Sequence, residues 1–204
     1  YMSAENTTNT GAQEAENAEK YAVEVKNVTK IYRLYDKPID RLKESLSVSH
    51  KEYHKDFYAL SDLSFTVEKG QTVGIIGQTG SSKTTLVQLI PRLYDVTKGE
   101  VKIDGINVKE YPVRHLRDAV AMVLQKNTLF SGSIMENLRW GDEEATDEQV
   151  KEAAKAAQAD GFVSEFADGY DRELGQGGVN VSGGQKQRVA IARALVGKPA
   201  ILLA

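Results

Sequence analysis

Hydrophobic and polar residues alternate in two segments of the first third of the chain, at 23–28 and 63–67. This two-residue period predicts strands with one buried and one exposed face. A different pattern follows at 72–76, where a mostly apolar run lies between two glycines. Such a run is typical of a strand buried on both faces, and we expect it to be parallel to its neighbours. The next apolar positions have helical spacing and predict an amphipathic helix from Thr84 to about Leu93.

Further short strands are predicted in the later part of the chain. Residues 99–105 alternate and end in an Asp-Gly pair, which favours a tight hairpin turn. Residues 119–124 and 200–204 are short apolar runs, which are typical of buried strands. Strands interspersed with helices predict an α/β fold.

Helix signals dominate from Asn127 to Asn180. Thr146 and Gln149 have the spacing of a capping box, in which each side chain accepts a hydrogen bond from the other residue's backbone N–H. The apolar face of the helix that follows is marked by Val150, Ala153, Ala154 and Ala157. We therefore expect an α-helical lobe inserted into the α/β core, with a further helix over 184–195.

These patterns divide the chain into four parts. Residues 1–20 are polar, small and acidic, a composition typical of a disordered tail. Residues 21–125 form the α/β core, with a charged insert at 36–55. Residues 126–180 form the α-helical subdomain. Residues 181–204 carry a glycine-containing motif, the last helix and the start of the last strand.

Composition narrows the class of protein without naming its function. The chain has 204 residues, of which 41% are hydrophobic and 27% charged, so it can bury a sizeable core as one domain with an inserted lobe. A net charge of −3 provides no broad basic field, and nucleic acid is therefore not expected as a partner. The absence of cysteine excludes disulfides and thiolate zinc sites, which fits the cytosol. No apolar run reaches the roughly 18 residues of a membrane helix, so any membrane span must come from another chain or segment.

The stretch G-Q-T-G-S-S-K-T-T-L at 77–86 nearly matches a phosphate-binding loop, also called Walker A. In such loops, backbone N–H groups and a helix N-terminus converge on the anion. Lys83 is expected to reach the β- and γ-phosphates, and the Thr84 hydroxyl to ligate Mg²⁺. The candidate nucleotide-binding residues are Gly77, Gln78, Thr79, Gly80, Ser81, Ser82, Lys83, Thr84 and Thr85.

One residue of this loop departs from the pattern, because Ser82 stands where glycine is usual. If Ser82 already has helical backbone angles, serine costs little. If its φ is positive, a residue with a Cβ costs roughly 1–2 kcal/mol, which weakens the site without abolishing it. The alternative interpretation is an ordinary tight turn before a helix.

A second motif carries a family resemblance. The segment V-S-G-G-Q-K-Q-R-V-A-I-A-R-A-L at 181–195 resembles the signature sequence of ATP-binding cassette (ABC) domains, with Val181 in place of leucine. Gln125 and the N-T-L-F-S-G-S-I-M-E-N-L segment at 127–138 resemble the Q-loop of the same family. The resemblance covers 21–204 and implies a P-loop NTPase core with a mixed sheet, an inserted α-helical subdomain and an incomplete C-terminus.

The resemblance implies a role for each motif. The signature residues Ser182, Gly183, Gly184 and Gln185 would contact ATP held by a second nucleotide-binding domain. Gln125 would ligate Mg²⁺ or the attacking water, which makes Lys83 and Gln125 the catalytic candidates and Thr84 and Gln125 the metal ligands. Adenine would stack on Tyr32, with Tyr35 and Tyr58 as alternatives, and R-E-L-G-Q-G-G at 172–178 would touch a membrane domain.

The subfamily resemblance is mixed. Residues 30–46 and 57–65 resemble the ATPase subunits of exporters of cell-surface polysaccharide and teichoic acid. From about Leu89 onward the chain resembles ATPase domains of multidrug and lipid exporters. Both imply an exporter ATPase at the cytoplasmic face of the membrane, partnered by a transmembrane domain or subunit and a second nucleotide-binding domain.

In the family, the last strand is followed by an Asp that orders Mg²⁺ and a Glu that acts as general base. The sequence stops at Ala204, before those positions. We therefore expect these 204 residues to hydrolyse ATP negligibly, whereas the complete protein would be an ATPase. A non-transport ABC-type ATPase and a non-catalytic nucleotide-sensing module remain alternatives.

Overall fold

A computed structural model describes residues 19–46, 52–78, 80–124 and 128–204. The chain forms two compact units, unit 1 from Tyr1 to Leu116 and unit 2 from Arg117 to Ala204. The predicted tail up to residue 18, together with Thr79 and Gln125, lies outside the described residues.

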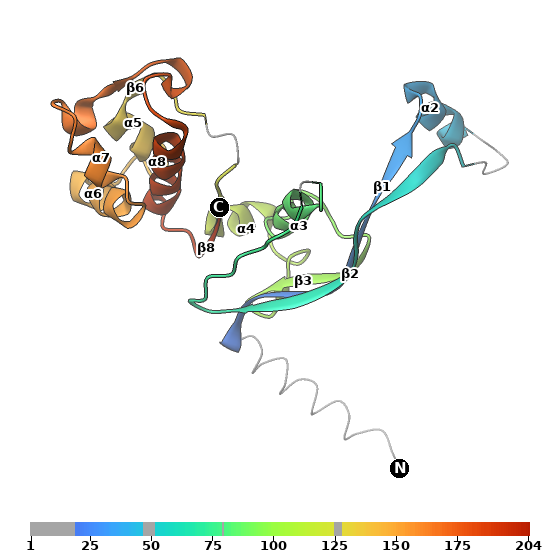
Figure 1. Ribbon diagram of the computed structural model, residues 1–204. Coiled ribbons are helices and arrows are strands. Elements are labelled where there is room, and N and C mark those ends of the chain that lie inside the picture. Colours follow the sequence, from blue (N-terminus) through green and yellow to red (C-terminus); the bar gives the residue numbers. More distant parts are fainter. Residues whose placement is uncertain (1–18, 47–51, 79, 125–127) are drawn as a thin grey trace, which may run out of the picture. The chain divides into compact units, whose positions relative to one another are not determined.

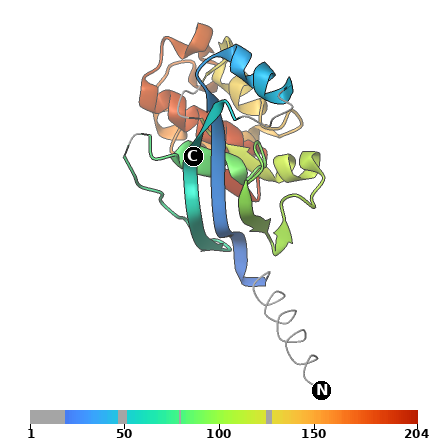
Figure 2. The same ribbon diagram turned by 90° about the vertical axis from the view of Figure 1, so that its right-hand side faces the viewer.

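Unit 1 is built on a four-stranded antiparallel sheet. The strand order is β2-β1-β3-β4, with β1 (Tyr21–Tyr35), β2 (His54–Glu68), β3 (Lys98–Ile103) and β4 (Ile106–Asn107). Figure 2 shows β1 and β2 running side by side, and the insert helix α2 (Pro38–Leu46) joins their far ends. The alternating segments at 23–28 and 63–67 are thus parts of longer strands.

The predicted alternation is confirmed at Val23 and Val25, which are buried, but it shifts by one residue before Val28, which is buried as well. The pairing with β2 is irregular between Val25 and Val28, where Asn27 has a positive φ of 47°. Glu24 is buried as well, at 2% exposure, although alternation assigns it to the open face. Its carboxylate pairs with Lys26 Nζ at 2.9 Å, which compensates the charge. The predicted Asp-Gly turn is confirmed, since Asp104 and Gly105 both have positive φ, 47° and 77°.

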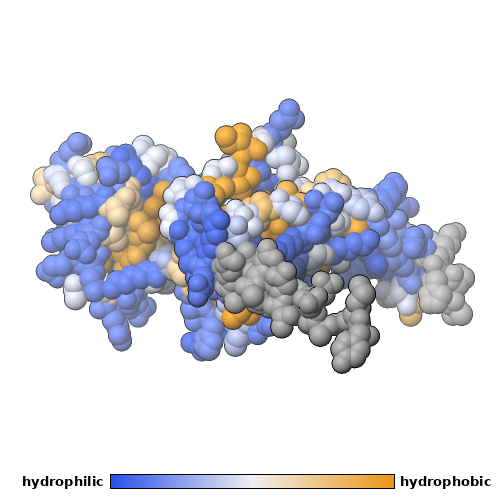
Figure 3. Space-filling view, turned by 90° about the horizontal axis from the view of Figure 1, so that it is seen from below, coloured by the Kyte–Doolittle hydropathy of each residue, from blue (hydrophilic) through white to orange (hydrophobic). Residues whose placement is uncertain are grey.

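The run at 72–76 does not form the predicted strand. It has no regular secondary structure, and Val73, Ile75 and Ile76 are 45%, 43% and 98% exposed. A strand buried on both faces exists only where neighbours pair with its edges, and no described strand pairs with this run. Hydrophobic side chains therefore reach the surface, and Figure 3 shows such groups on one face of the molecule.

The helix after the loop is shorter than predicted. α3 (Lys83–Leu89) ends before Ile90 and Pro91, whereas the apolar spacing suggested Leu93. Ile90 still has right-handed helical angles, with φ −63° and ψ −53°, but Pro91 after it has no N–H to donate to the helix. The regular hydrogen-bond pattern therefore ends before Pro91. The next helix, α4 (Val113–Ala119), spans the boundary between the units.

Unit 2 combines two small sheets with a helical core (Figure 1). β5 (Val120–Met122) pairs in parallel with β8 (Ile201–Leu203), and β6 (Gly132–Ser133) pairs antiparallel with β7 (Glu173–Leu174). The predicted strands at 119–124 and 200–204 exist, but Leu202 is 36% exposed rather than buried. The helices are α5 (Ile134–Arg139), α6 (Asp147–Ala156), α7 (Asp160–Val163) and α8 (Gly183–Val196), with 3-10 turns η1 (Gly169–Asp171) and η2 (Gln176–Gly178).

The apolar face predicted for α6 is confirmed. Val150 and Ala154 are fully buried, and Ala153 and Ala157 are nearly so, in a core shared with α5 and α8. The capping box is also confirmed. Gln149 N–H donates to Thr146 Oγ1 at 3.4 Å, and Thr146 N–H donates to Gln149 Oε1 at 3.0 Å.

Candidate nucleotide-binding site

The loop before α3 is organised around the ammonium group of Lys83. This group donates hydrogen bonds to Gly77 O at 2.6 Å, Gln78 O at 2.8 Å and Ser81 Oγ at 3.2 Å. All three acceptors are neutral, and within the described part of the chain no carboxylate pairs with Lys83. A cation that is held by neutral groups retains its charge for an anion, so the loop fits a phosphate group.

Two glycines of the loop are explained by geometry. A Cβ on Gly77 would lie 2.6 Å from Ser81 Oγ, so a side chain here would require the Ser81 hydroxyl to move, whereas Lys83 Nζ at 3.6 Å would be in ordinary contact. Gly80 has φ of 85°, a conformation that residues with a Cβ rarely adopt. Glycine is thus favoured at 77 by a close contact and at 80 by the backbone conformation.

The backbone of Ser82 has the left-handed conformation, with φ 59° and ψ 22°. The sequence allowed either helical backbone angles or a positive φ at Ser82. The structure has the positive φ, at which glycine would be less strained than serine. Ser82 is the N-cap residue of α3, and its side chain makes no capping hydrogen bond. Its carbonyl oxygen accepts the first helical bond, from Leu86 N–H at 3.1 Å.

We expect Ser82→Gly to raise the free energy of unfolding by about 0.5–1 kcal/mol. The left-handed strain of roughly 1–2 kcal/mol is relieved, and the larger entropy of glycine in the unfolded chain offsets part of the gain. Urea unfolding followed by circular dichroism measures the change. Ser82→Ala is the matched control, because it removes the hydroxyl but keeps the strain. An equal gain in both variants would show that strain at φ is not the cause.

The signature segment begins α8. Ser182 is its N-cap residue and forms a reciprocal capping box with Gln185, with bonds of 2.8 Å and 3.3 Å. Ser182, Gly183 and Gly184 are exposed, and a Cβ on either glycine would meet nothing within 4 Å. The N-terminus of this 14-residue helix is therefore open to an anion. Val181, in place of the family's leucine, is buried in the helical core and anchors the segment.

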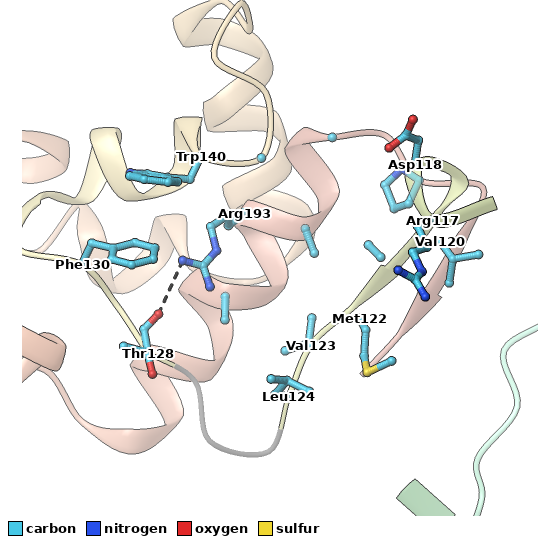
Figure 4. A pocket seen from close by; sticks show the side chains of 16 residues that line it. Arg117, Asp118, Val120, Met122, Val123, Leu124, Thr128, Phe130, Trp140 and Arg193 are labelled. Atoms are coloured by element: carbon cyan, nitrogen blue, oxygen red, sulfur yellow. Dashed lines mark hydrogen bonds between the residues drawn. The ribbon is translucent and has the colours of Figure 1, made fainter. Parts of the chain in front are cut away.

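Unit 2 also contains a cavity of about 710 Å³ beside β5, α5 and α8 (Figure 4). Phe130 and Trp140 stack across part of its wall with ring centroids 4.6 Å apart. The Arg193 guanidinium lies 5.7 Å from the Phe130 ring and donates to Thr128 O at 3.5 Å. Burial lowers the pKa of Arg193 below its ordinary value. Leu124 and Thr128 line the cavity on either side of the predicted Q-loop glutamine, Gln125, which itself lies outside the described residues.

Sequence reasoning missed Asn137, which supports this wall. Its side chain is 1% exposed and makes three hydrogen bonds to backbone groups. Phe130 N–H donates to Oδ1 at 2.8 Å, and Nδ2 donates to Phe130 O and Ser133 O at 3.0 Å each. A buried amide needs partners, so an asparagine among apolar helix positions was the available signal.

The aromatic residue predicted for adenine has partners of its own. Tyr32 packs edge-on against Tyr94, with centroids 6.2 Å apart, and Lys30 Nζ lies 5.1 Å from its ring centre. Tyr94 was not singled out from the sequence. Of the alternatives, the Tyr35 ring packs on His54 at 5.8 Å, while Tyr58 is 58% exposed. Tyr32 stays a prediction, and Tyr94 joins it as a candidate.

The predicted metal ligands belong to different parts of the chain. Thr84 is exposed at the start of α3, and Gln125 lies outside the described residues. Among the described residues, no group of three or more His, Asp or Glu side chains could hold a metal ion. Thr84 and Gln125 stay predicted Mg²⁺ ligands, and oxygen atoms of the nucleotide would complete such a site.

Taken separately, the two units define a mixed α/β nucleotide-binding domain with a helical subdomain, which is the fold of ABC-type ATPases. The family model described as ABC transporter matches residues 60–204, and the chain belongs to this family.

Comparison with known proteins agrees with this assignment. A multidrug export ATP-binding/permease protein of Staphylococcus aureus strain NCTC 8325 is 44% identical over 169 residues, which cover 81% of this chain and 29% of the relative. Its counterpart in the bovine strain RF122 is 47% identical over 144 residues, covering 71% and 25%. The chain therefore spans less than a third of the length of these relatives.

A solved structure supports the fold. A bacterial Atm1-family ABC exporter with ATP bound superposes with a TM-score of 0.72 at 35% identity, covering 90% of this chain and 29% of that one. The residues that the structure describes contain no helix long and apolar enough to cross a bilayer.

Proposed function

We propose that this chain binds Mg·ATP through the loop at 77–85 and that the complete protein uses ATP hydrolysis to power export across a membrane. The observation that carries the proposal is the Lys83 ammonium, which is held over the loop by three neutral acceptors. Family membership supports the choice of ATP, and the names of the relatives support export.

Each part of the site has a proposed task. Lys83 stabilises negative charge on the β- and γ-phosphates, and the N–H groups of the loop position them. Thr84 would hold Mg²⁺, and Gln125 would ligate Mg²⁺ or the attacking water. Tyr32 stacks on adenine. Bound Mg²⁺ supplies charge neutralisation between the phosphates.

The exposed N-terminus of α8 is the basis for proposing a second nucleotide-binding domain as a partner. Ser182, Gly183, Gly184 and Gln185 are proposed to contact ATP held by a second nucleotide-binding domain, because this helix N-terminus is open to an anion. A transmembrane domain or subunit would place the pair at the cytoplasmic face of the membrane. Nucleic acid is not proposed as a partner, given the net charge of −3.

Binding and turnover are separable properties. Hydrolysis requires a positioned general base, which typically contributes 10²–10⁴-fold to the rate, whereas binding requires the phosphate loop. We therefore propose that Mg·ATP binding at the loop is measurable independently of turnover. Phosphate release, measured in the same samples that are used for the binding titration, distinguishes ATP turnover from ATP binding.

Lys83→Ala is expected to weaken Mg·ATP binding roughly 10–100-fold, because hydrogen bonds to a charged group are lost at the phosphates. Isothermal titration calorimetry of Mg·ATP into the chain and the variant measures this change, with micromolar affinity expected for the unaltered chain. Lys155→Ala removes an exposed lysine of α6 and should bind as the unaltered chain does. Equal affinities for the Lys83 and Lys155 variants would refute the proposed phosphate site.

A further inference from the structure

The segment that follows α3 is fastened to the far part of β1 by hydrogen bonds. Thr97 N–H donates to Thr29 O at 2.9 Å, and Ile31 N–H donates to Thr97 Oγ1 at 3.0 Å. Between these two positions of β1, Lys30 Nζ donates to Asp95 O at 2.7 Å. Three consecutive residues of the strand therefore hold the segment in place, and one of them does so through a charged side chain.

Lys30 also contacts two aromatic rings. Tyr32 lies two residues further along β1, so it shares a face of the strand with Lys30. Its ring lies edge-on to Tyr94, at an angle of 86°. Lys30 Nζ lies 5.1 Å from the centre of the Tyr32 ring and 5.8 Å from that of Tyr94. An ammonium group over two nearly perpendicular rings occupies the corner between them, which leaves the opposite face of Tyr32 without this contact.

The charge of Lys30 is not used in an ion pair. Among the residues that the structure describes, no carboxylate pairs with it. The neighbouring Asp95 carboxylate pairs with Arg92 Nε at 2.9 Å instead. Fixing a long lysine side chain costs conformational entropy, which its contacts with the carbonyl and the two rings offset. The same contacts restrict the rings, so Lys30 helps to determine how Tyr32 is oriented.

We propose that Lys30 is a positioning residue for the nucleotide, which holds the Tyr32 ring in the orientation that stacks on adenine. This role rests on the proposed function, in which Tyr32 is the stacking residue. A base binds more tightly to a ring that is already fixed, because a mobile ring loses conformational entropy when the base binds. Tyr94 takes part by packing on Tyr32 and by providing the second ring that holds Lys30.

α3 connects this pair of rings with the phosphate loop within unit 1. The helix begins at Lys83, and Tyr94 follows its other end, where Leu93 N–H donates to Gln88 O at 2.9 Å. A helix of seven residues is about 10 Å long. One extended nucleoside triphosphate covers such a distance, so its phosphates and its base can meet the two ends.

Calorimetric titration of the 204-residue chain with Mg·ATP and with Mg·tripolyphosphate tests the proposal. Tripolyphosphate lacks the nucleoside, so the ratio of the two affinities reports nucleoside binding separately from phosphate binding. Lys30→Met keeps a long side chain but removes the ammonium, and it should lower this ratio about three- to fivefold, as expected for an exposed cation–π contact. Lys30→Arg retains a cation and hydrogen-bond donors and should leave the ratio unchanged.

Two further variants separate positioning from overall charge. Lys98→Met removes an exposed lysine of β3 in the same sheet and should leave the ratio unchanged. Tyr94→Leu should lower the ratio as Lys30→Met does, with no further loss when the two are combined, because both act through the orientation of Tyr32. Each variant should bind tripolyphosphate as the unaltered chain does. An equal loss of affinity for both ligands in Lys30→Met would overturn the positioning role.

Tyr32→Leu tests the function on which this role rests and should lower the ratio about tenfold, since it removes the stack itself. If Tyr32→Leu lowers the ratio and Lys30→Met does not, Lys30 only fastens the neighbouring segment, and the positioning role is wrong while the adenine site stands. If Tyr32→Leu leaves the ratio unchanged, or if the unaltered chain does not bind Mg·ATP, the proposed adenine site is refuted and the role of Lys30 with it.

Discussion

Asn137→Ala is expected to lower the free energy of unfolding of unit 2 by about 2–4 kcal/mol. The variant leaves the N–H and carbonyl of Phe130 and the carbonyl of Ser133 without their side-chain partner, and it opens a space in a closely packed site. Trp140 is the single tryptophan of the chain and stacks on Phe130, so its fluorescence reports this region during urea unfolding. The transition should move to lower urea concentration.

Asn180→Ala provides the control for this measurement. Asn180 also makes two hydrogen bonds to backbone groups, with Gly175 N–H at 3.2 Å and Glu173 O at 2.7 Å, but it is exposed. Water can replace its bonds, so we expect a loss of only about 0.5–1.5 kcal/mol. If both variants lost the same stability, burial of Asn137 would not determine its contribution.

Asn137 also connects the helical core with the predicted catalytic segment. It is fixed in α5, and its bonds hold Phe130, which lies shortly after the predicted Q-loop residue Gln125. In Figure 4, Phe130, Trp140 and Arg193 border the cavity of unit 2. The residue that stabilises unit 2 thus also positions one wall of this cavity.

Features set by near neighbours in the sequence could be predicted. The box of Thr146 and Gln149 and the buried face of α6 depend on residues a few positions apart, and both are confirmed. The turn at Asp104 and Gly105 is equally local. The signature and loop motifs indicate the family from their residue types alone, since close approach of backbone to phosphate requires those types.

Features that depend on distant partners could not be predicted. The run at 72–76 has the composition of a buried strand, but pairing with other strands decides whether such a segment forms one. The sequence of the charged insert at 36–55 does not reveal that Glu44 of α2 is held against the hairpin by His54 and Tyr53. The positive φ of Ser82 is likewise a property of the folded loop.

The contact of α5 with α8 leads to the second large prediction. Gly141 follows α5 and lies directly against the backbone of α8, so that a Cβ on Gly141 would overlap the carbonyl oxygen of Arg193. The same Cβ would lie 3.1 Å from Val196 Cβ. Neither a helix carbonyl nor a buried valine can move without disturbing the core around it.

Gly141→Ala should therefore lower the free energy of unfolding of unit 2 by about 3 kcal/mol, since overpacking against backbone forces the two helices apart. Urea unfolding followed by Trp140 fluorescence measures the loss, and the native spectrum should also change because Trp140 directly precedes Gly141. Gly161→Ala in α7 is the matched control. A Cβ there meets nothing within 4 Å, and alanine favours helix by roughly 0.5–1 kcal/mol, so stability should hold or rise. Equal stability of the two variants would mean that the backbones of α5 and α8 do not need the close approach that Gly141 permits.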